Sequence, residues 1–411
     1  MVIAGEASGD LLAAELVGAI RQVFADAPAV QTADAQPLHA SLAPRFFGAG
    51  GPRMAAAGVE LAFDLTTHSV IGLSAPLLNF FKFRRLLDQL QKLAWKRQPD
   101  AIICVDFDFF NRWFARSVKK FIGAGPDWFH AWRPALIKYV SPQVWASREG
   151  RAYSISKNFD LLLSLFPFEK AWYAKRVPKL RVEFVGHPLV DRYAAEIRSP
   201  PPNPAPSREA TILLLPGSRP GELRRHLPVL AETAKRLAAS RKAVFRMVLP
   251  RESLRSRVAP FETQIPSLEI QVGNLEDALT KADVAITKSG TVTLECALFG
   301  VPAVVFYKTS LLTYAVGKQL ATVKYLAMPN LLADEPVYPE FIQGAATAEN
   351  LARASLELLD DPARRSRVKA RLAQIVGLLG SPGASRRAAS AIVSFLNETT
   401  SAHQPNAVQA L

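Results

Sequence analysis

Short apolar runs alternate with longer segments in which apolar residues recur every three or four positions, and this alternation continues along most of the chain. A short apolar run is typical of a buried strand, and recurrence every three or four residues is typical of a helix with one buried face. Predicted strands occupy residues 2–5, 99–105, 137–140, 159–165, 182–185, 211–215, 284–287 and 303–307. Helices are predicted between them, for example over 10–23 and 86–97. Strands that alternate with helices indicate an α/β fold.

A proline-rich stretch, SPPPNPAP at 199–206, separates two halves that both show this alternation. Such a stretch contributes nothing to a hydrophobic core and forms a stiff, extended linker. We therefore expect a first domain over 1–198 and a second over 207–385. Residues 386–411 are expected to form the end of a C-terminal helix and a frayed tail.

The stretch 282–307 predicts a strand, a polar turn, a helix and a second strand. The turn contains Ser289, Gly290 and Thr291, and free N–H groups at the start of a helix suit an anion. Glu295 lies four residues after Thr291, so both side chains share one face of the helix. A hydroxyl beside a carboxylate fits the phosphate and the sugar hydroxyls of a nucleotide sugar. The alternative is an ordinary connection with Glu295 on a solvated face.

A second turn of the same kind, Pro216, Gly217, Ser218 and Arg219, follows the strand predicted at 211–215. A guanidinium such as that of Arg219 makes bidentate contacts with phosphate. Two such turns in one domain arise by chance much less often than one. Together they fit a diphosphate.

Two carboxylates, Asp106 and Asp108, come directly after the strand predicted at 99–105. In an open α/β sheet the carboxyl ends of the strands border the ligand crevice. Capping of the following helix is the alternative, and it accounts for one of the two carboxylates but hardly for both. His187 also follows a predicted strand, and for it we favour a hydrogen-bonded structural role over a catalytic one.

The composition is that of a globular protein, with 49% hydrophobic and 21% charged residues. Its two cysteines, Cys104 and Cys296, each lie in an apolar run and fit buried thiols in a reduced compartment. The sequence has no run of 18 uncharged apolar residues. It begins MVIAGEASGD, with acidic residues where a signal peptide needs positive charge. The first predicted strand is short because the chain begins inside it, and the sequence leaves open whether the true start lies upstream of Met1.

The formal net charge of +14 suggests a negatively charged partner, either nucleic acid or an anionic lipid surface. We expect no nucleic-acid partner, because the sequence has no RNP, zinc-finger or Walker A pattern. The segment 70–85 combines apolar residues with adjacent basic ones, which suits a segment at a membrane surface. A buried helix with a basic edge is the alternative. The residues predicted to face the membrane are Ile71, Leu73, Leu77, Phe80, Phe81, Lys82, Arg84 and Arg85.

Eight motifs in the same order resemble the lipid-A-disaccharide synthase family: AGEASGD (4–10), GAGGPRM (48–54), YVSPQVWA (139–146), FPFEK (166–170), FVGHPLVD (184–191), LLPGSR (214–219), SGTVTLEC (289–296) and MPNLLA (328–333). The resemblance implies a GT-B fold, in which two Rossmann-like domains face each other across a cleft. It implies transfer of diacylglucosamine from UDP-2,3-diacylglucosamine to 2,3-diacylglucosamine 1-phosphate, giving a β-1,6-linked disaccharide phosphate and UDP. It also implies a cytoplasmic enzyme, peripheral on the anionic inner membrane, that can form a homodimer. No cofactor or metal is expected, and no DxD pattern is placed for a metal in the second half.

The resemblance also assigns roles to single residues. Asn330 would contact the donor, and Glu6 would lie near the reaction centre. The family usually shows Asp-x-x-Asp-Phe-Asn after its buried strand, with the second Asp as the base. Here Phe109 occupies that position. Asp108 is our preferred base, with Asp106 or Glu6 as alternatives.

Two other classes of protein fit parts of this pattern. A UDP-sugar 2-epimerase-like enzyme would use a similar two-domain scaffold but would need no lipid surface. A catalytically degenerate relative would bind lipid without turnover, and the substitution of the usual base position by Phe109 leaves that alternative open.

Overall fold

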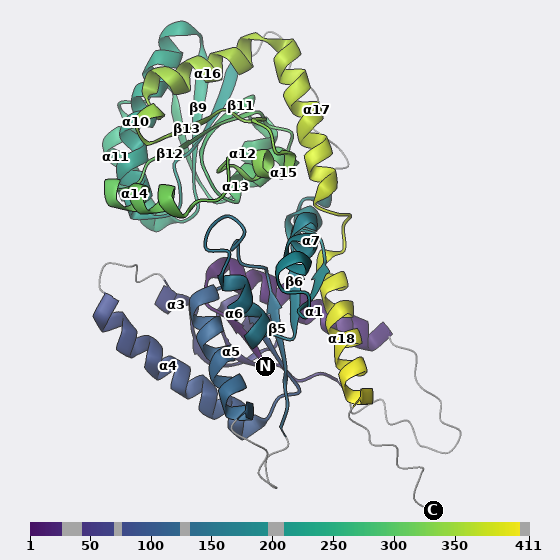
Figure 1. Ribbon diagram of the computed structural model, residues 1–411. Helices are drawn as coiled ribbons and strands as arrows, with labels where there is room; N and C mark the ends of the chain where they lie inside the picture. The colour runs from purple at the N-terminus through teal and green to yellow at the C-terminus, as the bar shows by residue number, and fades with distance from the viewer. Residues whose placement is uncertain (27–42, 70–75, 124–131, 196–208, 403–411) are drawn as a thin grey trace, which may run out of the picture. The chain divides into compact units, whose positions relative to one another are not determined.

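A computed structural model describes residues 1–26, 43–69, 76–123, 132–195 and 209–402 of the chain (Figure 1). The chain divides into two compact units. The first contains residues 1–144, 148–191 and the chain from Gly380 onwards, and the second contains residues 145–147 and 192–379. The predicted linker at 199–206 lies outside the described residues.

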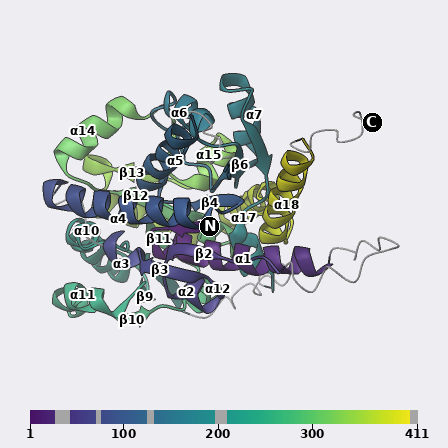
Figure 2. The ribbon, with the colours of Figure 1, turned by 90° about the horizontal axis from the view of Figure 1, so that it is seen from below.

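The first unit is built on a seven-stranded sheet with the order β3-β2-β1-β4-β5-β6-β7, and all of its pairings are parallel. In Figure 2, α1 and α2 lie on one side of this sheet and α4 and α5 on the other. The strands are β1 (Val2–Ala4), β2 (Phe47–Gly50), β3 (Glu60–Asp64), β4 (Ala101–Val105), β5 (Ala135–Tyr139), β6 (Leu161–Ser164) and β7 (Arg181–Phe184). The helices are α1 (Ala7–Asp26), α2 (Pro52–Ala56), α3 (Thr66–Ser69), α4 (Pro76–Arg97), α5 (Asp108–Gly123), α6 (Arg151–Asn158), α7 (Pro167–Arg176), α8 (Pro188–Arg192) and α18 (Ala384–Ala402).

The second unit repeats this plan with a six-stranded parallel sheet in the order β10-β9-β8-β11-β12-β13. Helix α10 packs against α11 and α16, whereas α13 packs against α15 and α17. The strands are β8 (Ala210–Leu215), β9 (Ala243–Leu249), β10 (Leu268–Val272), β11 (Val284–Lys288), β12 (Ala303–Tyr307) and β13 (Glu340–Ile342). The helices are α10 (Pro220–Ser240), α11 (Arg255–Glu262), α12 (Leu275–Lys281), α13 (Val292–Leu298), α14 (Leu311–Leu320), α15 (Met328–Ala333), α16 (Ala348–Asp360) and α17 (Pro362–Leu378), with 3₁₀ turns η2 (Glu252–Leu254) and η3 (Gln343–Ala345).

Both sheets reverse their strand order once, beside the first strand of each unit. In the first unit β1 lies between β2 and β4, and in the second β8 lies between β9 and β11. Ligands of doubly wound folds bind outside the carboxyl ends of the strands at such a reversal. The residues that follow β1, β4, β8 and β11 are therefore the ones the fold places for binding and chemistry.

The C-terminal residues form a long helix that belongs to the first unit. Residues 386–402 are part of the 19-residue helix α18, which packs against α1 in the first unit. The Asp191 carboxylate caps this helix by accepting hydrogen bonds from the N–H groups of Gly383, Ala384 (3.1 Å) and Ser385 (3.2 Å). The helix end predicted in this region agrees with α18, which continues as far as Ala402.

Candidate functional site

The turn between β8 and α10 closes on a carboxylate of its own helix. Glu222 Oε2 accepts hydrogen bonds from the N–H groups of Ser218 (2.9 Å) and Arg219 (3.3 Å). Gly217 has φ of +123°, and a Cβ built there would lie 2.4 Å from Glu222 Oε2. Glycine is therefore required at this position. The two N–H groups expected to form an open anion seat are occupied, whereas the Arg219 side chain is 74% exposed.

Lys288, at the end of β11, connects this turn to the predicted anion turn at Ser289–Thr291. Its Nζ lies 3.4 Å from Glu222 Oε1, and a Cβ at Gly290 would lie 3.2 Å from the same nitrogen. Burial alone would raise the pKa of Glu222. The charge of Lys288 and the hydrogen bonds from the N–H groups of the turn lower it by more, so the pKa lies below its usual value. Sequence reasoning missed Glu222. The signal was available, since a Glu at the third position of a helix commonly bonds back to its start.

Glu222 gives the turn a pH-dependent contribution to stability. Its pKa is lower in the folded state, so its contribution is present above the unfolded pKa of about 4.3 and is lost as pH falls through the folded value. Glu222→Gln is expected to lower the free energy of unfolding at pH 7 by about 1–2 kcal/mol, by weakening a helix-start interaction. The difference should shrink as pH falls below about 4.3.

Urea unfolding of the full chain at several pH values measures this effect. Glu232→Gln on the same helix is the control, because Glu232 is half exposed and forms only a 3.5 Å surface pair with Arg236. That control should change stability by less than about 0.5 kcal/mol at every pH. A Glu222→Gln effect that stays constant across the pH range would contradict the assignment.

His226 ties the carboxyl end of β8 to that of β12. The buried ring has Nδ1 2.6 Å from the Pro216 carbonyl, and Nε2 accepts from the Lys308 N–H at 3.2 Å. The Pro216 contact needs a proton on Nδ1, and Nε2 also lies 3.1 Å from the Lys308 carbonyl. Burial lowers the pKa of His226, which favours the neutral ring. We infer that His226 holds the two strand ends in place. Sequence reasoning missed this residue.

Near the Ser289–Thr291 turn, Glu295 is more enclosed than a residue on a solvated face. Its Oε1 accepts a hydrogen bond from the Tyr193 hydroxyl at 2.9 Å, and burial raises its pKa. Ser289 Oγ donates to the Leu326 carbonyl at 2.8 Å, whereas Thr291 is exposed. The interpretation of Glu295 as a residue on a solvated face was wrong. Its carboxylate is half-buried and held in one orientation.

Asn330 lies within the fold rather than at the surface of the turns. It is fully buried, and its Oδ1 accepts from the Tyr338 N–H while its Nδ2 donates to the Tyr338 carbonyl, each at 2.8 Å. The same Nδ2 lies 2.8 Å from Glu340 Oε1. These contacts engage both ends of the amide. The structure therefore does not bring the Asn330 side chain within direct reach of a nucleotide-sugar donor. It anchors α15.

In the first unit, a strained turn follows β4. Asp106 and Phe107 have φ of +47° and +42°, a left-handed conformation that is uncommon for residues other than glycine. The Phe107 ring lies over Gly5, where a Cβ would come within 2.1 Å of it. Asn111 Nδ2 donates to the carbonyls of Val105 (3.2 Å) and Asp106 (2.9 Å). The turn is therefore held from the β1 side and from its own helix.

Asp108 begins α5 and, like Asp106, is half-buried. Its Oδ2 lies 3.0 Å from Arg112 Nε and 3.8 Å from Arg151 Nη1. Its Oδ1 is buried and has no hydrogen-bond partner within the described part of the chain. Phe109, at the position of the usual family carboxylate, is 56% exposed and packs against Trp113.

The opening motif contributes one exposed and one buried carboxylate. Glu6 is exposed in the loop after β1. Asp10 is buried and accepts hydrogen bonds from the N–H groups of Gly51 (2.8 Å), Arg53 (3.0 Å) and Met54 (3.1 Å). Asp10 thus joins the AGEASGD motif to the GAGGPRM turn. These hydrogen bonds give the two motifs a shared structural role. They require no catalytic role for Asp10.

His187 has the structural role that the sequence favoured. The ring is buried, and Nδ1 accepts from the Leu189 N–H at 3.2 Å. Both cysteines are buried too, and burial raises the pKa of Cys104 to about 12.

The proposed membrane segment is only partly described. Ile71 and Leu73 lie outside the described residues, and Leu77 and Phe80 lie in α4 with side chains that are not described. Phe81 is 70% exposed, and Lys82, Arg84 and Arg85 are exposed. None of the helices in the described ranges is long and apolar enough to span a bilayer.

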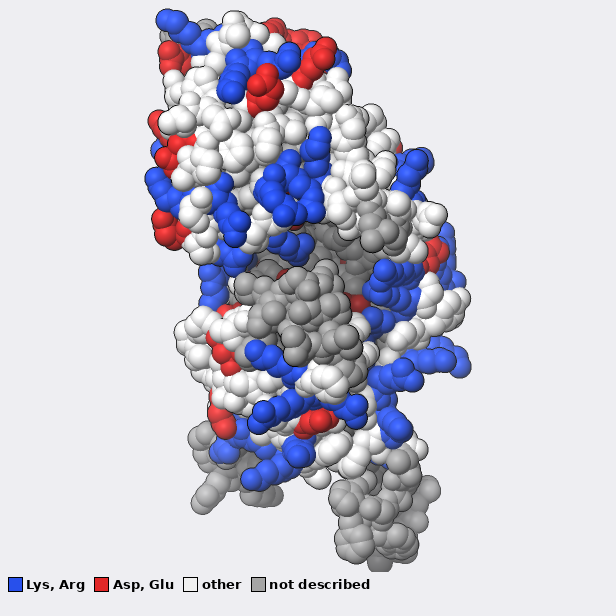
Figure 3. Space-filling view, turned by 90° about the vertical axis from the view of Figure 1, so that its left-hand side faces the viewer, with Lys and Arg blue, Asp and Glu red and all other residues white. Residues whose placement is uncertain are grey.

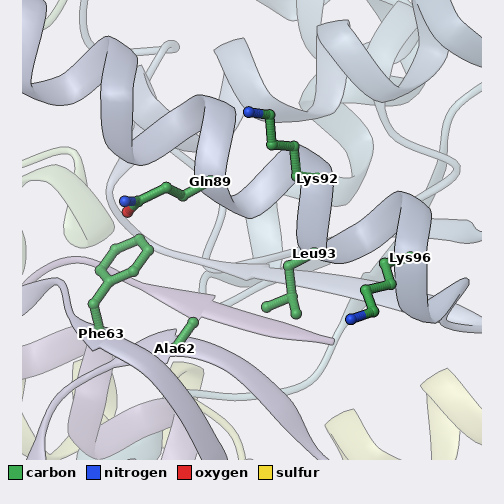
Figure 4. A pocket seen from close by; sticks show the side chains of 6 residues that line it. All are labelled: Ala62, Phe63, Gln89, Lys92, Leu93 and Lys96. Carbon is green, nitrogen blue, oxygen red and sulfur yellow. The ribbon is translucent and has the colours of Figure 1, made fainter.

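The exposed face of α4 continues this basic character beyond residue 85. Lys82, Arg85, Gln89, Lys92 and Lys96 recur at intervals of three and four residues, so they form one stripe along the helix. An open groove runs beside the stripe, with Phe63 and Leu93 on its floor and Lys92 and Lys96 along its edge (Figure 4). On the face shown in Figure 3, Lys and Arg side chains outnumber Asp and Glu.

Two Rossmann-like units, each with polar turns at the reversal of its strand order, define a protein of the GT-B class. Solved structures share this fold: a UDP co-structure of MnaA from S. aureus (TM-score 0.58, 14% identity, 97% of this chain and 96% of the other) and the calicheamicin glycosyltransferase CalG4 (TM-score 0.54, 13% identity, 98% of each). The family model for lipid-A-disaccharide synthetase matches residues 1–393.

Individual relatives agree with the family model. Lipid-A-disaccharide synthase from Geobacter metallireducens is 38% identical over 407 residues, covering 97% of both chains. The enzyme of that name from Syntrophus aciditrophicus is 35% identical over 408 residues, covering 97% of this chain and 98% of the other. The chain belongs to the lipid-A-disaccharide synthase family, and it is therefore a glycosyltransferase.

Proposed function

We propose that this protein transfers diacylglucosamine from UDP-2,3-diacylglucosamine to 2,3-diacylglucosamine 1-phosphate, giving the β-1,6-linked lipid A disaccharide 1-phosphate and UDP. Family membership supports the reaction, and the observation that carries it within this chain is the arrangement at the end of β8. There the exposed Arg219 guanidinium lies beside the Glu222–Lys288 pair, at the reversal of the strand order. Cationic groups at this position suit a leaving diphosphate without a metal ion.

On the donor side, Arg219 would hold the diphosphate, with Gly217 and Ser218 shaping the turn. Because Glu222 occupies the N–H groups of the turn, the donor phosphates would be bound mainly by side chains. Ser289, Gly290 and Thr291 would border the same site, and Glu295 would accept hydrogen bonds from the ribose hydroxyls. The Tyr193 hydroxyl supports this role for Glu295 by fixing its carboxylate.

On the acceptor side, Asp108 would take the proton from the 6-hydroxyl as that oxygen attacks the anomeric carbon and the bond to UDP breaks. Its Oδ1 makes no hydrogen bond among the described residues, so this oxygen keeps the acceptor capacity that a base needs. Because Oδ1 is buried, the turn would have to move for the 6-hydroxyl to reach it. Asp106 and Glu6 are the alternatives.

We further propose that the enzyme is cytoplasmic and peripheral on the inner membrane, where both acylated substrates reside. The exposed Phe81 and the basic stripe of α4 support contact with an anionic bilayer. The groove beside the stripe would add an apolar floor beneath lysines that meet headgroup phosphates (Figure 4). A homodimer, which the family resemblance implies, would be detected by analytical ultracentrifugation.

Release of UDP from the two diacyl substrates, measured with and without detergent, tests the reaction. Turnover that requires both substrates supports the proposal. Epimerisation of a soluble UDP-sugar would instead indicate an epimerase-like enzyme, and binding of both lipids without turnover would indicate a degenerate relative. The sequence relatives argue against the epimerase-like alternative, because the ones compared above carry the synthase name.

Reversing the charge of Lys82, Arg84 and Arg85 together is expected to release the protein from anionic vesicles. Each basic residue near such a surface contributes about 1 kcal/mol, so three replacements by Glu should weaken vesicle binding at least on the order of a hundredfold. Sedimentation with phosphatidylglycerol-containing vesicles measures the change.

A matched control reverses Lys157, Lys175 and Lys179, which are exposed residues of the same unit with the same total charge. That control should retain most of the vesicle binding. If both triple variants lose binding equally, net charge alone is responsible. If neither does, the membrane contact lies elsewhere.

A further inference from the structure

A buried lysine lies directly beneath the turn that carries the two candidate carboxylates. Lys138 belongs to β5, next to β4 in the sheet, and its side chain is only 1% exposed. Its ammonium group donates a hydrogen bond to the main-chain carbonyl of Asp106. Sequence reasoning did not single out this lysine, because it lies within a predicted buried strand.

Burying an ammonium group costs free energy, so a lysine persists inside a strand only where its contacts compensate. Burial lowers the pKa of Lys138, and the charges of Asp108, Cys104 and Asp106 act in the opposite direction, while Arg112 lowers the pKa further. Asp108 is the largest of the raising influences. The ammonium group therefore lies within the electrostatic reach of both candidate carboxylates.

The contact with the Asp106 carbonyl falls within the strained turn after β4. Asp106 and Phe107 both have a left-handed backbone, which persists only where the surroundings hold it. The Asp106 carbonyl accepts from Lys138 Nζ on one side and from Asn111 Nδ2 at 2.9 Å on the other. Two donors that converge on one carbonyl fix the orientation of the peptide between Asp106 and Phe107.

We propose that Lys138 is a positioning residue for the acceptor base. By holding the Asp106 carbonyl it sets the left-handed turn, and the turn sets where the first residue of α5, Asp108, places its carboxylate. In this chain Phe109 occupies the usual position of the base. Asp108 lies one residue earlier, so the backbone of the turn has to orient its carboxylate toward the acceptor hydroxyl. The inference rests on the proposed function of Asp108.

Lys138→Met tests the proposal, since methionine fills similar volume without a donor. We expect kcat for UDP release to fall on the order of tenfold to a hundredfold, as for a small displacement of a catalytic group, with KM for the UDP donor unchanged. Lys138→Gln keeps a neutral donor and should recover part of the loss. Lys120→Met, an exposed lysine on α5, is the matched control and should keep the kcat of the wild type.

A readout independent of activity separates this inference from the proposed reaction. The Asn111 N–H donates to the Phe107 carbonyl at 3.2 Å, so hydrogen exchange at Asn111 reports on the turn. Exchange there should speed up in Lys138→Met, while the free energy of unfolding is unchanged or higher because a buried charge is gone. This readout applies even if the wild type fails to release UDP, an outcome that would refute only the reaction.

Wild-type kcat and wild-type exchange at Asn111 in Lys138→Met would overturn the proposal. A fall in kcat that accompanies global unfolding in both Lys138→Met and Lys138→Gln would overturn it too, because Lys138 would then serve stability alone. Lower kcat with faster local exchange and an intact fold supports the positioning role.

Discussion

Replacing Arg219 by alanine is expected to lower kcat for UDP release on the order of a hundredfold or more. A positioned donor aimed at charge that develops in the transition state is worth roughly 3–4 kcal/mol. The Arg219 side chain is 74% exposed at the end of β8, so it is accessible to the diphosphate of the donor. The structural function of the residue is carried by its main chain, whose N–H and carbonyl stay in place in the variant.

The same assay distinguishes charge from geometry. Arg219→Lys keeps the charge but loses the planar fork of donors, so it should recover only part of the rate. Arg224→Ala removes an exposed arginine from the same helix and should leave the rate unchanged. Near-normal turnover of Arg219→Ala would refute its assignment to the diphosphate.

Asp108→Asn is expected to reduce kcat by a similar factor, on the order of a hundredfold or more, because it removes the base and keeps the shape of the side chain. Binding of the UDP donor should be unaffected, since Asp108 belongs to the first unit and the proposed donor residues to the second. Stopped assays of UDP release at saturating substrates, together with UDP titration, measure the two quantities separately.

The competing assignments of the base give opposite results in parallel variants. If Asp106→Asn or Glu6→Gln abolishes turnover while Asp108→Asn keeps the full rate, the base is one of those residues. A rescue experiment sharpens the test: Phe109 is 56% exposed, so Phe109→Asp should be accommodated and should restore turnover in the Asp108→Asn background. If Asp108→Asn, Asp106→Asn and Glu6→Gln all keep the full rate, none of these three carboxylates is the base.

The sequence by itself determined the fold class, because the periodicity of buried strands and one-faced helices is a local property of each segment. Strands predicted at 211–215 and 303–307 match β8 (Ala210–Leu215) and β12 (Ala303–Tyr307) within one residue. The family was also readable, since its motifs cluster where strands end. Less apolar strands were not predicted, and β3, with its partly exposed residues, is an example.

Only the tertiary structure decided what the polar residues at those strand ends contact. Glu222 occupies the N–H groups of the turn that the sequence left open, and Asn330 uses its amide inside the fold. Lys138 reaches the Asp106 carbonyl from a neighbouring strand 32 residues away in sequence. Helix α18 is ordered by α1 at the opposite end of the chain. These outcomes depend on pairs of residues brought together by the packing of sheets and helices, and no local pattern encodes the partner of a buried polar group.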